Sequence, residues 1–503
     1  MKKRFKIILI IWFALNHCYS QSCLPQGITF STQDQVDNFQ YNYPGCEEIA
    51  GSVTINGDSI TNLNGLSALT SIGGQLWING TDALINLSGL ENLASIGHQL
   101  YINANTALVD LTGLNSLASI GGNLYIGENN VLQSLSGLEN MESFEGNLTI
   151  INNSLLNDIT ALAKLDYVDG LLTIENNDSM IDLAGLNNVS YVNGYVLIQQ
   201  NDTMQNFAGL NSLEKIKGDF VIDRNYKLES LTGLENLDTI FGMLSVQWNH
   251  QLTNMMGLNQ LKFVRDEVFI MFNYGLEDLS GLESLTASYY LSLTRNTALV
   301  SLNGLENLNS LGHALTIWNN ENLTSIEALE NLSSPLDFLY VYGNLKLESL
   351  KGLDNIVDTA LVRLQIEANH MLSDCAVQSI CHYLSDPGGE IDIGDNLTGC
   401  NNSGEILEAC ETLSVDESSV VGRQSSVGVY PNPAAHQLFI SLPITYEIVH
   451  SEFEILNSNG ALMQYGSLPG NQATIDISNL PEGLYLLRIE DGKDQNATRF
   501  VKR

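Results

Sequence analysis

Leucine and isoleucine recur along most of the chain in a pattern that fits neither an amphipathic helix nor a single strand. In residues 87–105, LSGLENLASIGHQLYINAN, the apolar positions are spaced by two, three and four. The same order, L-x-x-L-x-G-L-x-x-L-x-x-I-x-G-x-L-x-I-x-x-N, returns with a period of about 24 residues. A fixed period of this length is typical of a solenoid, because so small a unit buries its apolar side chains only by stacking on its neighbours.

The number of repeats can be counted from the glycine of the G-L pair. Its column contains Gly65, Gly89, Gly113, Gly137, Gly185, Gly209, Gly233, Gly257, Gly281, Gly304 and Gly352. Ala161 and Ala328 fill the two gaps, so the chain holds 13 copies. The step from Gly281 to Gly304 is one residue shorter than the others. The sequence therefore predicts about 13 coils of roughly 24 residues each.

Each copy contains one segment with the alternation of a strand. Leu100-Tyr101-Ile102 and its counterparts alternate apolar and outward positions, and they are rich in aromatic and β-branched residues. We expect these strands to pair in parallel from coil to coil. The L-x-x-L-x-G-L-x-x-L segment carries too much Gly, Asn and Ser for a helix, so we interpret it as a bend with a second and third short extended side.

An asparagine follows the predicted strand in twelve of the copies. The column contains Asn105, Asn129, Asn153, Asn177, Asn201, Asn225, Asn249, Asn273, Asn296, Asn320, Asn344 and Asn369. A buried side-chain amide at this place can bond to turn backbone groups that would otherwise lack a partner. We interpret the column as a structural ladder.

These residues together resemble the receptor L domain, the leucine-rich-repeat-like right-handed β-helix of insulin-receptor-type ectodomains. The resemblance rests on I-G-x-x-L-Y-I-x-x-N followed by A-L-x-x-L-x-G-L, and it covers about residues 50–385. It implies an all-β, right-handed parallel β-solenoid. It leaves the ligand open, because a fold alone does not specify what is bound.

The two ends of the chain carry cysteines and targeting features. A basic start followed by an apolar run from Ile7 to Leu15 is typical of a secretory signal peptide, which we place at residues 1–20. No other apolar segment is long enough to span a bilayer, so we do not expect an integral membrane protein. Export from the cytoplasm also permits disulfide bonds.

The remaining cysteines lie outside the repeats and predict disulfide-stapled caps. They are Cys23, Cys46, Cys375, Cys381, Cys400 and Cys410. We expect an N-terminal cap at residues 21–50 closed by Cys23–Cys46, a solenoid at 51–374 and a C-terminal cap at 375–410, whose four cysteines allow three pairings. A zinc site from Cys375, Cys381, His382 and Cys400 is the alternative, but it lacks any C-x-x-C spacing.

After a Ser- and Val-rich stretch at residues 411–427, interpreted as a linker, alternating runs and turn signals predict a small antiparallel β-sandwich at 428–503. This block resembles the C-terminal sorting domain of the type IX secretion system of Bacteroidetes-type bacteria. Its motif residues are Tyr430, Pro431, Asn432, Pro433, Gly460, Gly483 and Tyr485. The resemblance implies two partners, the type IX secretion machinery and a sortase-like peptidase, and delivery through the periplasm to the exterior or the cell surface.

The net charge and the scattered positions of the reactive residues argue against several classes of function. With 21 Lys and Arg against 57 Asp and Glu, the formal charge is −36, which disfavours a nucleic-acid partner. The constant coil length leaves no inserted loops to build a catalytic site, and no nucleophile, metal or phosphate motif is present. We therefore expect no enzyme, no metal and no cofactor.

Aromatic residues collect at the outward positions of the predicted strands and at the corner that follows. They are Trp77, Tyr101, Tyr125, Trp248, Phe269, Phe272, Trp318, Tyr340 and Tyr342. Stacked rings also stabilise a sheet by themselves, so this face is either a structural ladder or a surface for a protein or glycan ligand. The sequence favours an adhesin-like secreted binding protein; the alternatives are a surface-coat component without a specific ligand and a polysaccharide-cleaving β-helix enzyme.

Overall fold

The computed structural model describes residues 22–357, 361–416, 428–430, 434, 436–441, 452–457, 461–468, 472–481, 483–490 and 495–502. The chain divides into two compact units, one up to Leu413 and one from Ser414. The expected signal peptide at residues 1–20 lies outside the described residues. Each unit is described by itself below.

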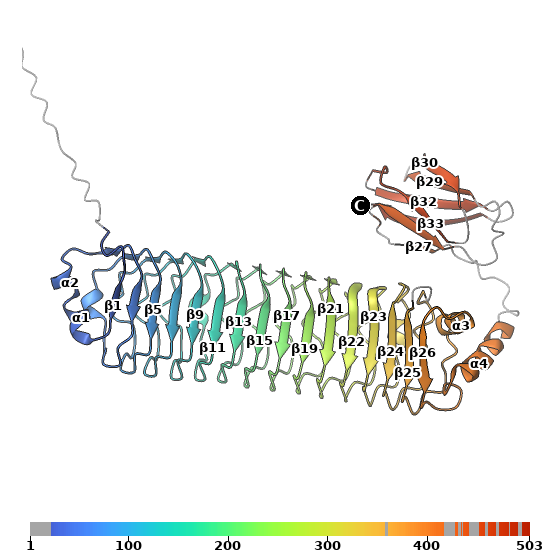
Figure 1. Cartoon of the computed structure of the whole chain (residues 1–503), viewed down its shortest axis with the longest axis horizontal. Helices are drawn as coiled ribbons and strands as arrows, with labels where there is room; N and C mark the ends of the chain where they lie inside the picture. The colour runs from blue at the N-terminus through green and yellow to red at the C-terminus, as the bar shows by residue number, and fades with distance from the viewer. Residues whose placement is uncertain are drawn as a thin grey trace, which may run out of the picture. The chain divides into compact units, whose positions relative to one another are not determined.

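The first unit is a parallel β-solenoid in which every repeat supplies one strand of a long sheet, as predicted (Figure 1). These strands are β5 (Leu76–Asn79), β7 (Leu100–Asn103), β9 (Leu124–Gly127), β11 (Leu148–Ile151), β13 (Leu172–Glu175), β15 (Val196–Gln199), β17 (Phe220–Asp223), β19 (Leu244–Gln247), β21 (Glu267–Met271), β22 (Ala287–Thr294), β23 (Ser310–Trp318), β24 (Phe338–Tyr342) and β25 (Arg363–Glu367). Strands β1 (Ile28–Phe30) and β3 (Val53–Ile55) precede them and β26 (Glu390–Gly394) follows. The solenoid thus has about 15 turns, since the chain on both sides of the 13 repeats continues it.

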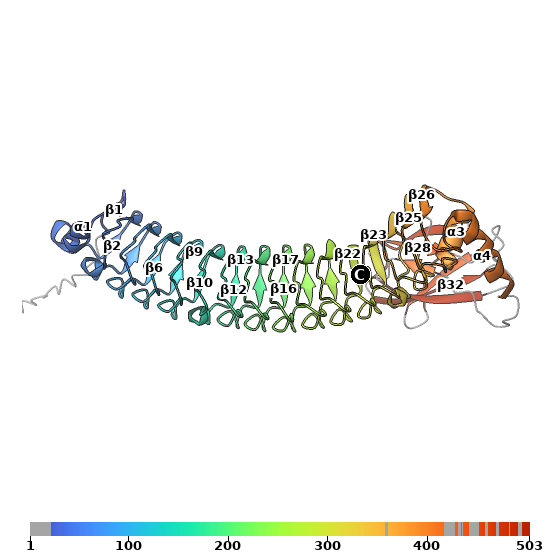
Figure 2. The ribbon, with the colours of Figure 1, turned by 90° about the horizontal axis from the view of Figure 1, so that it is seen from below.

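A second set of parallel strands, mostly two residues long, runs along another side (Figure 2). They are β2 (Glu48–Ile49), β4 (Ser71–Ile72), β6 (Ser95–Ile96), β8 (Ser119–Ile120), β10 (Ser143–Phe144), β12 (Tyr167–Val168), β14 (Tyr191–Val192), β16 (Lys215–Ile216), β18 (Thr239–Ile240) and β20 (Phe263–Val264). The leucine-rich return segment before each of them forms turns. Three coils have 3-10 helices there, at Asn64–Leu66, Thr160–Leu162 and Glu327–Leu329. Among the described residues, the expected third extended side is present as isolated bridges such as Ser134 with Asp158.

The one shortened coil removes the corner between the two kinds of strand. Phe263 pairs with Ala287, a full period further along the chain, but Val268 pairs with Leu291, which is one residue short of a full period. The missing residue therefore lies between these pairs. Here β22 runs through both positions as one strand, and β23 does the same, with a register shift between Ser288 and Tyr290.

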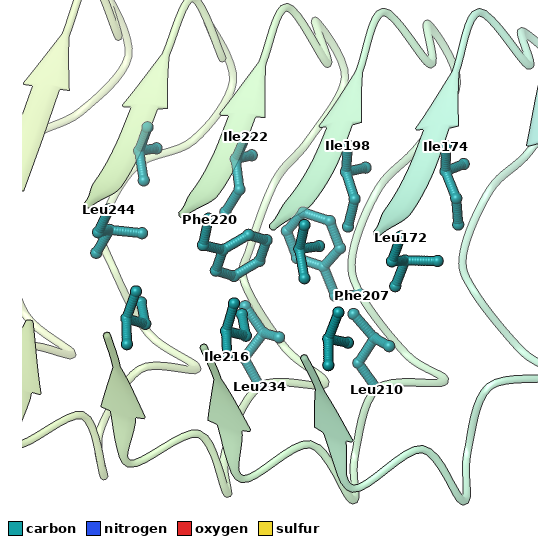
Figure 3. Close-up of a cluster of buried hydrophobic side chains, with 14 of the residues drawn as sticks. Leu172, Ile174, Ile198, Phe207, Leu210, Ile216, Phe220, Ile222, Leu234 and Leu244 are labelled. Carbon is teal, nitrogen blue, oxygen red and sulfur yellow. The ribbon is translucent and has the colours of Figure 1, made fainter. Parts of the chain in front are cut away.

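The interior is one hydrophobic cluster that extends from Phe30 to Ile406. Figure 3 shows Phe220 from β17, Ile216 from β16 and Phe207 from the return segment directed into it. The Phe207 and Phe220 rings meet edge to face, with centroids 6.4 Å apart. Because strand partners are one period apart in the sequence, like side chains from successive coils stack in columns.

The asparagine column is a buried ladder, as predicted. All 12 side chains are fully buried. The amide nitrogen of Asn201 donates to the carbonyl oxygen of Ile174 at 3.0 Å, and its amide oxygen accepts from the backbone N–H of Asn177 at 3.0 Å. Thr81 begins the ladder and Asn396, which accepts from the Asn369 N–H, ends it. Each rung thus satisfies backbone groups of the neighbouring coil at a corner where water cannot reach them.

Glycine in the G-L pair has a steric cause. At Gly209 the backbone is left-handed, with φ +112°, and an added Cβ would lie 1.9 Å from the carbonyl oxygen of Leu183. Ala161 and Ala328, which fill the two gaps, both lie in 3-10 helices. The coils with alanine therefore avoid the left-handed turn by a different local structure.

Both ends of the solenoid are covered by disulfide-linked caps. At the N-terminus, α1 (Gln33–Asp37) and α2 (Phe39–Asn42) bring Val36 and Phe39 onto the core, and Cys23 is joined to Cys46 as expected. At the C-terminus, α3 (Gln378–Ser385) and α4 (Ser403–Asp416) are held by Cys375–Cys400 and Cys381–Cys410. The structure thereby selects one of the three pairings.

The structure distinguishes the two interpretations of these cysteines and extends the last helix of the cap. All three cysteines of the alternative zinc site are consumed in disulfides, so they cannot ligate zinc. Helix α4 continues to Asp416 and so includes the first residues of the stretch interpreted as a linker, since no Pro or Gly lies between Cys410 and Asp416 to end it. Residues 417–427 lie outside the described part of the chain.

The second unit contains two small antiparallel sheets, as predicted. One consists of β27 (Gly428–Tyr430), β28 (Gln437–Ser441) and β31 (Gln472–Asp476), and the other of β29 (Glu452–Asn457), β30 (Leu462–Ser467), β32 (Gly483–Glu490) and β33 (Gln495–Lys502). Both contribute to one core. Within it Tyr485 donates its hydroxyl to the Pro481 carbonyl oxygen at 2.7 Å and stacks on Phe500. Gly483 begins β32, Tyr430 ends β27, and Pro431, Asn432, Pro433 and Gly460 lie outside the described residues.

We predict that Asn201→Ala destabilises the solenoid. The substitution leaves the Ile174 carbonyl and the Asn177 N–H buried without their partner, at roughly 1–3 kcal/mol for each group. Urea unfolding followed by circular dichroism measures the loss. Gln205→Ala, an exposed position in the same coil, is the control and should change the unfolding free energy by less than about 0.5 kcal/mol. Equal stability of the two variants would contradict the structural role of the ladder.

We also predict that Gly209→Ala destabilises the solenoid by at least about 1–3 kcal/mol, because alanine at this left-handed turn meets the Leu183 carbonyl. Gly394→Ala is the matched control, since an added Cβ there has no neighbour within 4 Å. Thermal unfolding of both variants makes the comparison. An effect of Gly209→Ala below about 0.5 kcal/mol would show instead that this coil converts to the 3-10 turn seen at Ala161.

Candidate ligand-binding surface

The outward aromatic residues lie on the long sheet and at the corner after it, and each of the nine is at least partly exposed. Alternation along the strand produces this: in β23, Ile317 is buried and Trp318 is exposed. Trp248 and Phe272 occupy a different place, the corner position whose backbone is left-handed, each with φ +58°. Bulky residues rarely adopt this conformation.

Near the N-terminus, Trp77, Tyr101 and Tyr125 form a ladder. Their ring centroids lie 5.1 and 4.4 Å apart, and the two tyrosine rings are stacked. Burial, with the neighbouring Tyr101 hydroxyl as a second cause, raises the pKa of Tyr125 to about 12. The stacked Tyr101 and Tyr125 rings cover one another's faces, whereas Trp77 at the end of the ladder stays partly open to solvent.

The aromatic face is not continuous. Between Tyr125 and Phe269 the same outward register holds smaller or aliphatic residues, namely Thr149, Thr173, Leu197, Val221 and Ser245. The surface proposed from the sequence therefore separates into an N-terminal ladder and a C-terminal cluster.

The C-terminal cluster surrounds a trough of about 460 Å³ on strands β21 to β25. Its lining residues are Phe269, Met271, Phe272, Tyr290, Ser292, Thr294, Thr316, Trp318, Tyr340, Tyr342 and Gln365. One outward register runs Phe269, Ser292, Thr316, Tyr340 on adjacent strands. Two small residues thus lie between two rings three strands apart, which is about 14 Å at the usual strand spacing.

The floor and walls of the trough are held by polar contacts and ring contacts. The Tyr290 hydroxyl lies 2.9 Å from the Thr316 hydroxyl, and the Ser292 and Thr294 hydroxyls lie 3.1 Å apart. Tyr290 also meets the Phe269 ring edge to face at 5.5 Å. Burial is the main cause that raises the pKa of Tyr340. Hydroxyl groups therefore form the floor of a site whose walls are aromatic.

Trp318 differs from the stacked rings in its open surface. Its indole meets Tyr342 edge to face, with centroids 5.7 Å apart and planes at 77°. Trp318, beside the trough, is 46% exposed, compared with 36% for Trp77. An exposed indole beside a hollow offers a flat apolar surface to a ligand.

A second hollow of about 730 Å³ continues from the trough around the corner. Its lining residues are Tyr274, Arg295, Thr297, Asn319, Glu321, Tyr342, Gly343, Leu345, Ala368 and His370. Tyr342 lines both hollows. The guanidinium of Arg295 lies over the Phe272 ring, 5.7 Å from its centroid. The corner hollow is thus lined by both polar and apolar side chains and carries charges of both signs.

Sequence reasoning missed several members of this surface. Tyr290 lies one position before the first inward residue of its strand, Leu291, where it pairs with Glu267, and the sequence interpretation considered only positions after the first inward residue. Tyr226, His250 and Tyr274 each follow a ladder asparagine and form a stack, with centroids 5.2 and 4.8 Å apart. The signal that finds them is the shared register one residue after the asparagine column.

No histidine is among the residues that line the trough. Within the described residues, no three His, Cys, Asp or Glu side chains gather to hold a metal ion. His98 and His313 share a register, and His313 lies 2.8 Å from the Asp337 carboxylate and stacks on Tyr289. Among the same residues, no helix is long and apolar enough to cross a membrane.

Comparison with known proteins yields two family matches. Residues 45–118 and 166–229 match the receptor L domain, and residues 428–503 match the secretion system C-terminal sorting domain. No curated protein matches the chain. The sorting domain indicates secretion to the cell surface or exterior and interaction with the secretion machinery. The chain therefore combines receptor L domain repeats, which form a β-solenoid, with a type IX secretion C-terminal sorting domain.

Proposed function

We propose that this secreted protein is a non-enzymatic, adhesin-like binding protein whose ligand occupies the aromatic trough on strands β21 to β25. The observation that carries the proposal is the trough itself. It combines open ring surface, buried hydroxyl groups and a volume within the range of small-ligand sites, roughly 300–1,000 Å³.

The location of the trough also supports binding. Elsewhere the coils repeat with little change, whereas the trough lies where β22 and β23 depart from the regular coil. A purely mechanical rod has no need of exposed rings around a concavity, since exposed apolar surface carries a risk of aggregation. The stacked N-terminal ladder is explained by sheet stability alone.

Absence of turnover is part of the proposal. The trough is lined by no His, Cys, Asp, Glu, Lys or Arg. General acid–base and nucleophilic catalysis need such groups within reach of the reacting atoms. The side chains present can position a ligand by stacking and hydrogen bonding, and they supply no proton-transfer group that titrates near neutral pH.

Binding should depend on the trough and not on the N-terminal ladder. We predict that Trp318→Ala weakens saturable binding to an immobilised ligand at least about tenfold, as expected for loss of an aromatic anchor. Trp77→Ala, the matched control, should leave the dissociation constant within about twofold. The measurement is surface binding of the purified secreted protein to an array of glycans and extracellular proteins, with ligand breakdown monitored in parallel.

Three results would count against this proposal. If the protein binds nothing on the array, a surface-coat role without a specific ligand is favoured. Equal loss in Trp77→Ala and Trp318→Ala would mean that the trough is not the site. Release of cleaved ligand would show that the protein is an enzyme.

A further inference from the structure

The trough and the corner hollow form one composite surface, because Tyr342 lines both. We propose that this surface binds a neutral oligosaccharide chain. One sugar ring lies in the trough against Trp318 and Tyr340, and the chain continues over Tyr342 into the hollow beside Arg295 and Glu321. This inference rests on the proposed function and adds the chemical class and the path of the ligand.

The trough selects an amphipathic ligand. Its walls are rings and its floor carries the Ser292, Thr294 and Thr316 hydroxyls. A pyranose ring has an apolar C–H face and a rim of hydroxyls, so it can stack on an indole while its rim meets such a floor. The Ser292 and Thr316 hydroxyls are paired with those of Thr294 and Tyr290, and each hydroxyl oxygen has a second lone pair that can accept from a sugar hydroxyl.

Backbone recognition of a peptide is excluded at this site. Strands β21 to β25 each pair on both sides within the sheet. Their N–H and C=O groups are therefore committed, and no edge is available for an added strand. A ligand over this face can be recognised only through side chains.

The corner hollow supplies the second part of the path. Arg295, Glu321 and Asn319 line it. Guanidinium, carboxylate and amide groups are planar and offer paired donors or acceptors, which suit the adjacent hydroxyls of a sugar. The Phe272 ring under Arg295 holds the guanidinium in place. The two hollows therefore suit different parts of one chain.

The net negative charge of the chain argues against other ligands of similar shape. No charged residue lines the trough, and the chain carries a formal charge of −36. An acidic polysaccharide or a second copy of this protein would meet long-range repulsion. A neutral saccharide avoids that repulsion and needs no charged partner in the trough.

The test is calorimetric titration of the full secreted chain with neutral hexaoses: cellohexaose, laminarihexaose, maltohexaose, mannohexaose, xylohexaose and chitohexaose. We expect at least one to bind, with an affinity about tenfold above that of its disaccharide, because the longer chain reaches the corner hollow. Trp318→Ala should weaken both lengths at least about tenfold. Arg295→Ala should remove the advantage of the hexaose over the disaccharide. Trp77→Ala is the control for both.

The outcomes separate this inference from the proposed function. If no neutral hexaose binds while an acidic glycan or a protein does so in a Trp318-dependent way, the ligand class is wrong and the trough remains a binding site. Equal affinity for disaccharide and hexaose overturns the two-hollow path. If Trp318→Ala does not weaken hexaose binding, both the class and the trough are overturned. Circular dichroism of each variant verifies that the fold is kept.

Discussion

The solenoid depends on a side-chain amide that takes the place of water. At the corner after each strand of the long sheet, the chain turns sharply and its backbone is buried. No regular secondary structure is present there to pair the backbone N–H and C=O groups. The column from Asn105 to Asn369 solves this by bonding each coil to the next. Since a buried, unpaired N–H or C=O costs roughly 1–3 kcal/mol, a dozen unsatisfied corners would exceed the stability of a typical domain. Apolar stacking drives the assembly, and the amides make the corners compatible with it.

The regular coil also explains why residues differ between repeats mainly at outward surface positions. Inward positions are fixed by stacking, the corner asparagine by hydrogen bonding and the turn glycine by close backbone approach. What remains free to vary is the outward register of the strands. There, large rings beside large rings produce the stacked ladder at Tyr101, whereas small residues between rings produce the trough at Thr316. The shape of the surface thus follows from the order of large and small residues across neighbouring strands.

Much of this architecture could be predicted from the sequence, and the limits are physical. The regular period predicted the coils, the strands and the ladder, because one rule repeats many times. Cys23–Cys46 was predicted because these are the two cysteines directly before the first repeat. The C-terminal disulfides were left with three pairings because Cys375, Cys381, Cys400 and Cys410 lie beyond the repeat. The aromatic positions were predicted, but their roles were not. Whether a ring stacks on its neighbour, as Tyr125 does, or stays open, as Trp318 does, depends on side-chain rotamers that the spacing does not encode. Tyr290 was missed because it precedes the first inward residue of its strand, a position that the repeat pattern did not mark as outward.

The one-residue deletion in the step from Gly281 to Gly304 has a consequence for how such a protein can evolve. Each coil of a solenoid interacts mainly with its two neighbours. Whole repeats before Phe269 can therefore be duplicated or lost without altering the residues around the shortened coil. The distance from the N-terminal end to the trough and the composition of the trough are inherited as separate traits, so a lineage can change the reach of the protein without changing its recognition surface.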